Sequence, residues 1–297
     1  MIYTIKYILI NYFFHIPMNI QKIFLSILGG LFLLYISWFL WLYSTSTVDG
    51  VLNLYSNTYG VIPLISGIYG LFVAQRWGGF KSAVGRAISF LSLGLITWGI
   101  GMVIWLYYNI ILGVGVPYPS FADAAFILSW PLWAFGVINL SKATGATFQL
   151  RKSGGKIFLL IIPIAIAAIS YYLLVNVARG GAVLTDYDTE LSPLLNNLKL
   201  FFDLAYPIGD IVILALSVLI YGLSFQYLGG RFKLPIILIL LGFVVNYFAD
   251  FTFSYTTTLE TYYNGSLADV LFVTTMTLLG VGIALFNPSN EKSAKNN

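Results

Sequence analysis

Four aspartates lie at or within hydrophobic stretches of this 297-residue chain, where an ionised carboxylate is costly. Asp123, Asp210 and Asp269 each follow Ala or Gly, with Ser or Pro three positions earlier. Three carboxylates at one depth of a helical bundle, between axes ~8–10 Å apart, would hold a hard cation or a cationic ligand group through oxygen. The pattern also fits helix capping, because Ser120 and Ser266 occupy N-cap positions with an acid at the third helical position.

Asp250 is harder to explain as a helix cap. It lies five residues before the outer end of an expected span at 234–255, where the helix dipole disfavours an anion. Asn246, Asp250 and Ser254 recur at i, i+4 and i+8 and so share one helical face. We expect Asp250 to point into the bundle, toward a polar cavity lined by Asn246 and at least one of the other three aspartates. A hydrogen bond to a neighbouring helix, or an ion pair with Lys199, is the structural alternative.

Aromatic residues could complete such a pocket. Trp98, Trp105 and Tyr108 recur along one side of an expected span, although an aromatic stripe inside a bundle also serves simple packing. The pattern specifies no catalytic residue, metal, cofactor or oligomeric state. The candidate residues for binding a ligand or cation are Asp250, Asn246, Asp210, Asp123, Asp269, Trp105 and Tyr108.

The composition excludes several classes of protein. Hydrophobic residues make up 59% of the chain, charged residues 9%, and the mean hydropathy is +0.88, so the chain belongs in a membrane. It has no cysteine and a single histidine, His15, outside the expected spans, which excludes thiolate sites, histidine-bound metals and His-dependent triads. Although the pI is near 9, the basic residues are spread over short segments, and we expect no nucleic-acid partner.

Eight hydrophobic runs, each about the ~20 residues that a membrane helix needs, predict an all-α polytopic bundle of four out-and-back hairpins. With both termini in the cytoplasm, thirteen of the fifteen Lys and Arg residues face inward, and Arg179 and Lys199 do not. A multi-pass protein of the cell membrane, surrounded by lipid, is predicted. The expected spans are 23–43, 59–75, 87–110, 121–141, 157–177, 207–228, 234–255 and 267–287. The inward basic clusters are Lys6/Lys22, Arg76/Lys81/Arg86, Lys142/Arg151/Lys152/Lys156, Arg231/Lys233 and Lys292/Lys295.

One membrane domain at 23–287 is expected, between an interfacial segment at 1–22 and a short cytoplasmic tail at 288–297. Met18 could also serve as a start, which would make residues 1–17 dispensable. Residues 192–206 form either a helix on the outer surface or an extension of the sixth span. The fourth, sixth and eighth spans are predicted to start near Phe121, Pro207 and Leu267, with Pro207 in a first turn.

Short ordered motifs resemble a known family. They are Val116-Pro-Tyr-Pro-Ser-Phe-Ala-Asp-Ala-Ala-Phe, Ala205-Tyr-Pro-Ile-Gly-Asp, Ala249-Asp250 and Tyr262-Tyr-Asn-Gly-Ser-Leu-Ala-Asp269. The stretch 90–287 resembles the multi-span N-terminal membrane sensor module of bacterial GGDEF/EAL signalling proteins and some histidine kinases. The resemblance implies a sensory role, here without the output domain. A separate cytoplasmic signalling partner would then carry the signal.

Three classes of function remain. The first is a stand-alone membrane sensor that binds a small molecule, lipid or cation in its outer half and acts through a partner. The second is a secondary transporter that couples protons or cations through membrane carboxylates. Against it, no expected span shows a clear Gly or Pro break, and the acids lie near the outer face. An intramembrane enzyme ranks last, since no nucleophile–base pair is recognisable, and we expect no enzyme.

Overall fold

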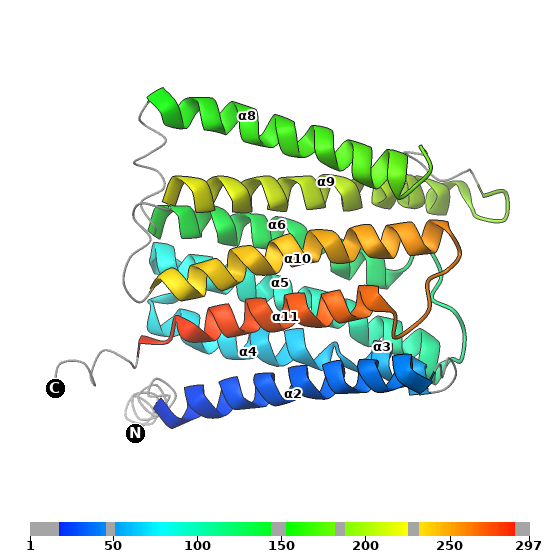
Figure 1. The fold of residues 1–297 in the computed structure, drawn as a ribbon, viewed down its shortest axis with the longest axis horizontal. Helices are drawn as coiled ribbons and strands as arrows, with labels where there is room; N and C mark the ends of the chain where they lie inside the picture. Colours follow the sequence, from blue (N-terminus) through cyan, green and yellow to red (C-terminus); the bar gives the residue numbers. More distant parts are fainter. Residues whose placement is uncertain (1–17, 46–50, 144–152, 182–187, 225–231, 289–297) are drawn as a thin grey trace, which may run out of the picture.

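The computed structural model describes residues 18–45, 51–143, 153–181, 188–224 and 232–288, and within these ranges the secondary structure is helical (Figure 1). The α-helices are α2 (Met18–Thr45), α3 (Val51–Thr58), α4 (Val61–Arg76), α5 (Ala83–Leu106), α6 (Phe121–Ala143), α8 (Ser153–Ser170), α9 (Pro193–Ser224), α10 (Lys233–Thr258) and α11 (Leu267–Leu285). A 3₁₀ turn, η1 (Gly79–Lys81), precedes α5, and π-helical turns η2 (Tyr107–Ile111) and η3 (Tyr171–Val177) extend α5 and α8.

Seven helical stretches in the described part of the chain are long and apolar enough to cross a bilayer. They are α2, α3 with α4, α5 with η2, α6, α9, α10 and α11, and they correspond to seven of the eight expected spans. The other expected span, 157–177, falls on α8 and η3, where the apolar helix Ile161–Val177 is shorter. The chain therefore folds as an all-helical protein suited to a multi-pass membrane position.

Several predictions fall on residues that the structure does not describe. Most of the N-terminal segment 1–22 and nearly all of the tail 288–297 lie outside the described ranges, and α2 begins at Met18. The same holds for part of the basic clusters and for the single histidine. These residues are Lys6, His15, Arg151, Lys152, Arg231, Lys292 and Lys295.

Six helices pack in a closed ring. In order around it, α4 packs against α5, α5 against α6, α6 against α9, α9 against α10, α10 against α11, and α11 against α4. Helix α2 flanks the ring on the α11 side and α8 flanks it on the α9 side, so that these two helices form opposite edges of the bundle (Figure 1). Large aromatic side chains, among them Trp98, Trp133 and Phe243, are buried within the ring.

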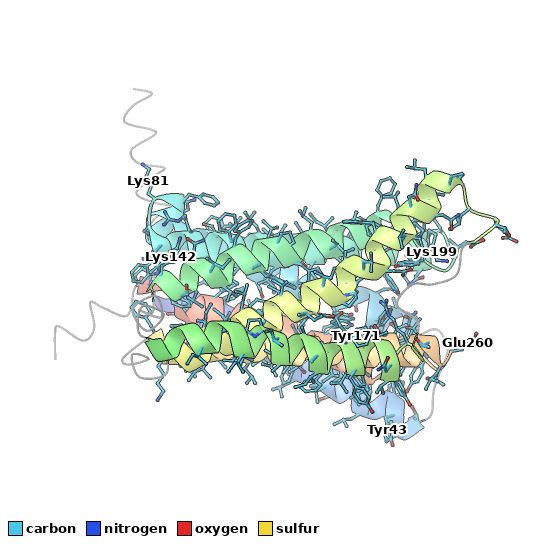
Figure 2. All side chains as sticks on the ribbon, turned by 90° about the horizontal axis from the view of Figure 1, so that it is seen from above. Tyr43, Lys81, Lys142, Tyr171, Lys199 and Glu260 are labelled. Carbon is cyan, nitrogen blue, oxygen red and sulfur yellow. The ribbon has the colours of Figure 1, made fainter. Side chains whose placement is uncertain are left out.

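The two ends of the bundle differ in charge. Lys81 and Lys142 lie at one end, whereas Lys199 and Glu260 lie at the other (Figure 2). The first and last described membrane helices meet at the Lys81 end, where the Gln21 amide nitrogen donates to the Ala284 carbonyl oxygen at 2.9 Å. We call the Lys81 end the inner end and the Glu260 end the outer end.

Glycines allow the ring helices to approach closely. A Cβ on Gly94 of α5 would lie 2.3 Å from the indole ring of Trp133 on α6, and one on Gly280 of α11 would lie 2.3 Å from the Ser66 hydroxyl on α4. A Cβ on Gly70 of α4 would lie 2.1 Å from the Ser92 hydroxyl on α5. Small side chains of this kind let membrane helices pack backbone to backbone.

Helix α9 corrects one boundary. The sixth span was predicted to start near Pro207, but α9 starts at Pro193 and carries Pro207 in its interior. Residues 192–206 thus extend the span rather than form a separate surface helix. The fourth and eighth spans start at Phe121 and Leu267, as predicted. Proline inside a membrane helix is tolerated where neighbouring groups or local adjustment satisfy the backbone that it disturbs.

We predict that Gly94→Ala will lower the free energy of unfolding by about 1–3 kcal/mol, since the new methyl group must displace the fully buried Trp133 ring. The matched control is Gly29→Ala in α2, where a Cβ would meet no atom within 4 Å. There the helical preference for alanine should leave stability unchanged or raise it slightly. Chemical denaturation in detergent measures both, and equal effects at the two positions would contradict the packing described.

Candidate functional site

Helix α9 presents a polar stripe to the inside of the bundle. Asp203, Tyr206, Asp210 and Ser217 follow at i, i+3, i+7 and i+14, so at ~100° per residue they share one face. Asp203, Asp210 and Ser217 are buried. Since a helix rises ~1.5 Å per residue, Asp210 lies about 10 Å deeper than Asp203. The stripe therefore leads from the outer end of α9 into the bundle.

Asp203 anchors the outermost part of this stripe. Its Oδ1 accepts a hydrogen bond from the Tyr118 hydroxyl at 2.7 Å, and the Arg179 guanidinium donates to its backbone carbonyl at 3.1 Å. Burial raises the pKa of the Tyr118 hydroxyl well above its usual range, and the hydrogen bond to Asp203 raises it further. Tyr118 therefore remains a hydrogen-bond donor at any physiological pH.

Asp123 forms the next layer and caps α6. Its Oδ2 accepts from both the backbone nitrogen and the hydroxyl of Ser120 at 2.8 Å. The Ser120 oxygen in turn accepts from the backbone nitrogens of Ala122 and Asp123, at 3.2 and 3.4 Å. The predicted capping box is therefore present. The carboxylate does more than cap, because its Oδ1 accepts from the Tyr206 hydroxyl on α9 at 2.9 Å.

Asp210 on α9 and Asp250 on α10 make a side-chain hydrogen bond further along the stripe, below the level of Tyr206. A hydrogen bond between two carboxyl groups requires that one of them carries a proton. The Asn246 amide nitrogen, one helical turn below Asp250, donates to Asp250 Oδ2 at 2.5 Å. Asp250 therefore contacts Asn246 and one of the other three aspartates, the neighbours expected from the sequence, whereas the polar cavity expected around them stays a prediction.

One buried acceptor of this group is unsatisfied and another has no donor outside the carboxyl pair. Asn246 Oδ1 has no hydrogen-bond partner among the described residues, and Asp210 Oδ1 has none other than Asp250, although the two side chains are only 1% and 4% exposed. Burying an acceptor without a donor costs about 1–3 kcal/mol. We call Asp210, Asp250 and Asn246 the carboxyl–amide cluster.

Asp269 lies in a different group. Its Oδ2 accepts from the Gly265 backbone nitrogen at 2.6 Å, and its Oδ1 accepts from the hydroxyls of Tyr262 and Tyr59 at 3.3 and 3.4 Å. Ser56 makes a further side-chain hydrogen bond to it. Burial, followed by the charge of Asp269, raises the pKa of the Tyr262 hydroxyl well above its usual range. This carboxylate ties the loop before α11 to α3 and to the turn between α3 and α4.

The predicted meeting of three carboxylates is therefore not observed. Within the described ranges, no three acidic or histidine side chains gather closely enough to hold a metal ion. Asp210 is not a cap, since it stands in the interior of α9. The capping box at Ser266 and Asp269 is incomplete, because the Ser266 hydroxyl makes no capping bond.

Trp105 and Tyr108 lie elsewhere. The Trp105 ring packs 6.5 Å from Phe126, and Tyr108 packs 6.1 Å from Tyr107. These ring contacts lie outside the carboxyl–amide cluster, so the predicted part of Trp105 and Tyr108 in a shared pocket is not supported. The unexpected members of the stripe are Asp203 and Tyr206. A helix starting at Pro193 would have placed both on the Asp210 face by spacing alone.

An apolar groove of about 460 Å³ lies between α6 and α9. On α9 it is lined by positions 201, 204, 205, 208, 209 and 212, which are centred roughly opposite Asp210 around the helix. Several of these side chains, such as Phe201 and Ile208, are exposed on the surface that would face lipid. The groove therefore does not open onto the carboxyl–amide cluster.

Comparison of the chain with models of known protein families, with curated proteins and with solved structures gives no match. The function of the chain must therefore be inferred from the geometry of the site.

The two N-cap serines give a matched test of this geometry. Ser120→Ala should lower the free energy of unfolding by about 1 kcal/mol, because the Ser120 hydroxyl joins the capping box. Ser266→Ala should cost little or nothing, since the buried Ser266 hydroxyl has no hydrogen-bond partner among the described residues. Denaturation curves of the two variants decide the point, and a larger loss for Ser266→Ala would show that the assigned hydrogen bonds are wrong.

Proposed function

We propose that the protein is a membrane sensor that binds a small ligand at the carboxyl–amide cluster and acts through a separate cytoplasmic partner. The observation that carries this proposal is the pair of carboxyl groups between two helices, the buried Asp210 and the half-buried Asp250, with the unsatisfied Asn246 oxygen beside them. Ionisable groups within a membrane span are costly and are usually functional. The resemblance of residues 90–287 to bacterial sensor modules favours sensing over other uses of such a site.

We further propose eight spans with both termini in the cytoplasm of a cell-membrane protein. Helices α8 and η3 together cover 25 residues, long enough for an eighth crossing at ~1.5 Å per residue. The inner end carries Lys81 and Lys142, in accord with the positive-inside rule. Seven crossings alone would place the ends of the chain on opposite sides, whereas α2 begins and α11 ends at the same end of the bundle (Figure 1).

A route from the site to the inner end supports a sensory role. Helix α10, which carries Asp250, packs along α11. At the inner end of α11, the Trp77 indole nitrogen donates to the Phe286 carbonyl oxygen at 2.6 Å, and Arg76 donates to the Asn287 side chain. A shift of α10 at the outer end would therefore be transmitted to groups at the inner end, where a partner would read it.

The test is Asp250→Asn, which keeps the shape of the side chain and removes its charge. Because the chain has no cysteine, a fluorophore on Phe80→Cys, an exposed inner-end position, reports on that end alone. We expect the variant to fold and to shift the emission of the label, because sensing requires coupling between the two ends. Glu260→Gln, a neutralised acid at the same outer end, should leave the emission unchanged. Identical emission from the Asp250→Asn variant and the parent would exclude the sensor.

Proton- or cation-coupled transport is the second candidate. The sequence argument against it, that no span is clearly interrupted, is weakened by Pro131, Pro163 and Pro207, all inside helices. Pro207 lies three residues before Asp210, close enough to affect the local backbone of α9.

Reconstituted liposomes separate the two candidates. The liposomes contain a pH-sensitive dye, and a potassium-diffusion potential is applied across their membrane. If the protein is a sensor, the proton flux into liposomes that contain it should not exceed the flux into protein-free liposomes. A proton flux that Asp250→Asn abolishes and Glu260→Gln leaves intact would favour the transporter instead, because charge movement would then depend on the carboxyl pair.

A further inference from the structure

The chemistry of the ligand can be inferred from the hydrogen bonds that the carboxyl–amide cluster does not make. The Asn246 amide nitrogen is used by Asp250, and a proton is needed between Asp250 and Asp210. Two acceptors remain available: Asn246 Oδ1, which is buried and has no donor among the described residues, and Asp210 Oδ1, which has no donor outside the carboxyl pair. A ligand that completes the cluster must therefore donate hydrogen bonds.

The charge of the cluster favours a positive donor. Two carboxyl groups that share one proton carry a net negative charge, and a negative charge in an apolar span is stabilised by a cation at hydrogen-bonding distance. A metal ion is less suitable, because the described residues contain no group of three acidic or histidine ligands. An N–H cation differs from a metal ion in that it directs separate hydrogen bonds to separate acceptors.

The route to the cluster carries the same sign of charge. From the outer end inward, the stripe passes the carboxylates of Asp203 and Asp123 before it reaches Asp210. Tyr206, between these levels, is within electrostatic range of both Asp123 and Asp250. Two described cations, Arg179 and Lys199, also lie toward the outer end (Figure 2), and Arg179 makes contacts along this route. Its guanidinium donates to the Asp203 carbonyl oxygen, and its charge also acts on Asp210.

Other unsatisfied groups near the bundle centre do not change this assignment. The indole nitrogen of Trp133 also has no partner among the described residues, but it faces the backbone of Gly94 on α5. The apolar groove between α6 and α9 is on the opposite face of α9 from Asp210, so a long apolar tail on the ligand would find no groove at the cluster.

We propose that the carboxyl–amide cluster binds a small protonated amine, either ammonium or a primary alkylammonium ion, that reaches it from the outer end along the α9 stripe. The proposal depends on the proposed function for the location of the site and adds the class of ligand. The ammonium group donates to Asp210 Oδ1 and Asn246 Oδ1, and its charge balances that of the carboxyl pair. A quaternary ammonium ion has the same charge but no N–H donor, and is therefore excluded.

The experiment measures thermal unfolding of the full-length protein in detergent at one pH and one ionic strength. Methylammonium chloride is titrated against tetramethylammonium chloride and sodium chloride. We expect methylammonium to raise the unfolding temperature saturably, by about 4 °C or more once its concentration is roughly a hundredfold above the dissociation constant. Tetramethylammonium and sodium should give no saturable rise.

Three variants locate the effect. Asp250→Asn and Asp210→Asn should each weaken methylammonium binding by at least about tenfold, because each removes a charge-assisted acceptor. Glu260→Gln, with the same loss of charge at the same end of the bundle, should bind as the parent does. If a variant of the pair fails to fold, the comparison of methylammonium with tetramethylammonium in the parent protein still decides the ligand class.

Each outcome has a separate meaning. An equal rise with tetramethylammonium or sodium would show that charge alone is recognised and would overturn the amine proposal. So would the absence of any rise. In either case a shift of the inner-end label by Asp250→Asn would still support the sensor. Conversely, methylammonium binding could depend on Asp250 while Asp250→Asn leaves the emission of the inner-end label unchanged. That result would support the amine site and exclude the sensor.

Discussion

The contact between Asp210 and Asp250 is the constraint on which the outer half of this protein depends. Two carboxyl groups can remain within an apolar layer only if they share a proton or meet donors, and only if helices shield them from lipid. The structure provides the shielding on both sides of the pair. Ala249 and Gly209, their neighbours in sequence, are buried, and Tyr247 donates to the Ser170 hydroxyl at the end of α8 at 2.9 Å. On this side of the bundle α8 packs against α9, and η3 packs against α10.

Much of the fold follows from the sequence, because hydrophobic length and charge act locally. Seven of the eight expected spans coincide with long apolar helices, and α6 and α11 start where the Ser-x-x-Asp pattern predicts. The start of α9 was predicted wrongly because Pro207 resembles a first-turn proline. Nothing local reveals that the preceding turns from Pro193 are also helical. That extension is favoured by its buried face, whose partners, Asp123 on α6 and Arg179 after η3, are far away in sequence.

The candidate site was predictable to the extent that one helix fixes it. Asn246 and Asp250 are one turn apart, so their contact follows from helical spacing. The pairing with Asp210 follows from the adjacency of α9 and α10, which the short connection between the two spans favours. Asp269 did not join the site despite its similar sequence context. Equal depth in the membrane does not make two helices neighbours, and α11 packs on α4 and α10, away from α9. Which helices are neighbours depends on the packing of the whole ring and cannot be read from one span.

The placement of α8 has a consequence for how the protein tolerates different membranes. In the described part of the chain, α8 packs on α9, and its π-helical end contacts α10, while the ring closes without it. A bilayer thinner or thicker than the helix is accommodated by tilting, at a cost of fractions of a kcal/mol per Å. Because α8 lies at an edge of the bundle, it can tilt without bending the other helices. The ring and α8 can therefore adjust separately to the hydrophobic thickness of the bilayer.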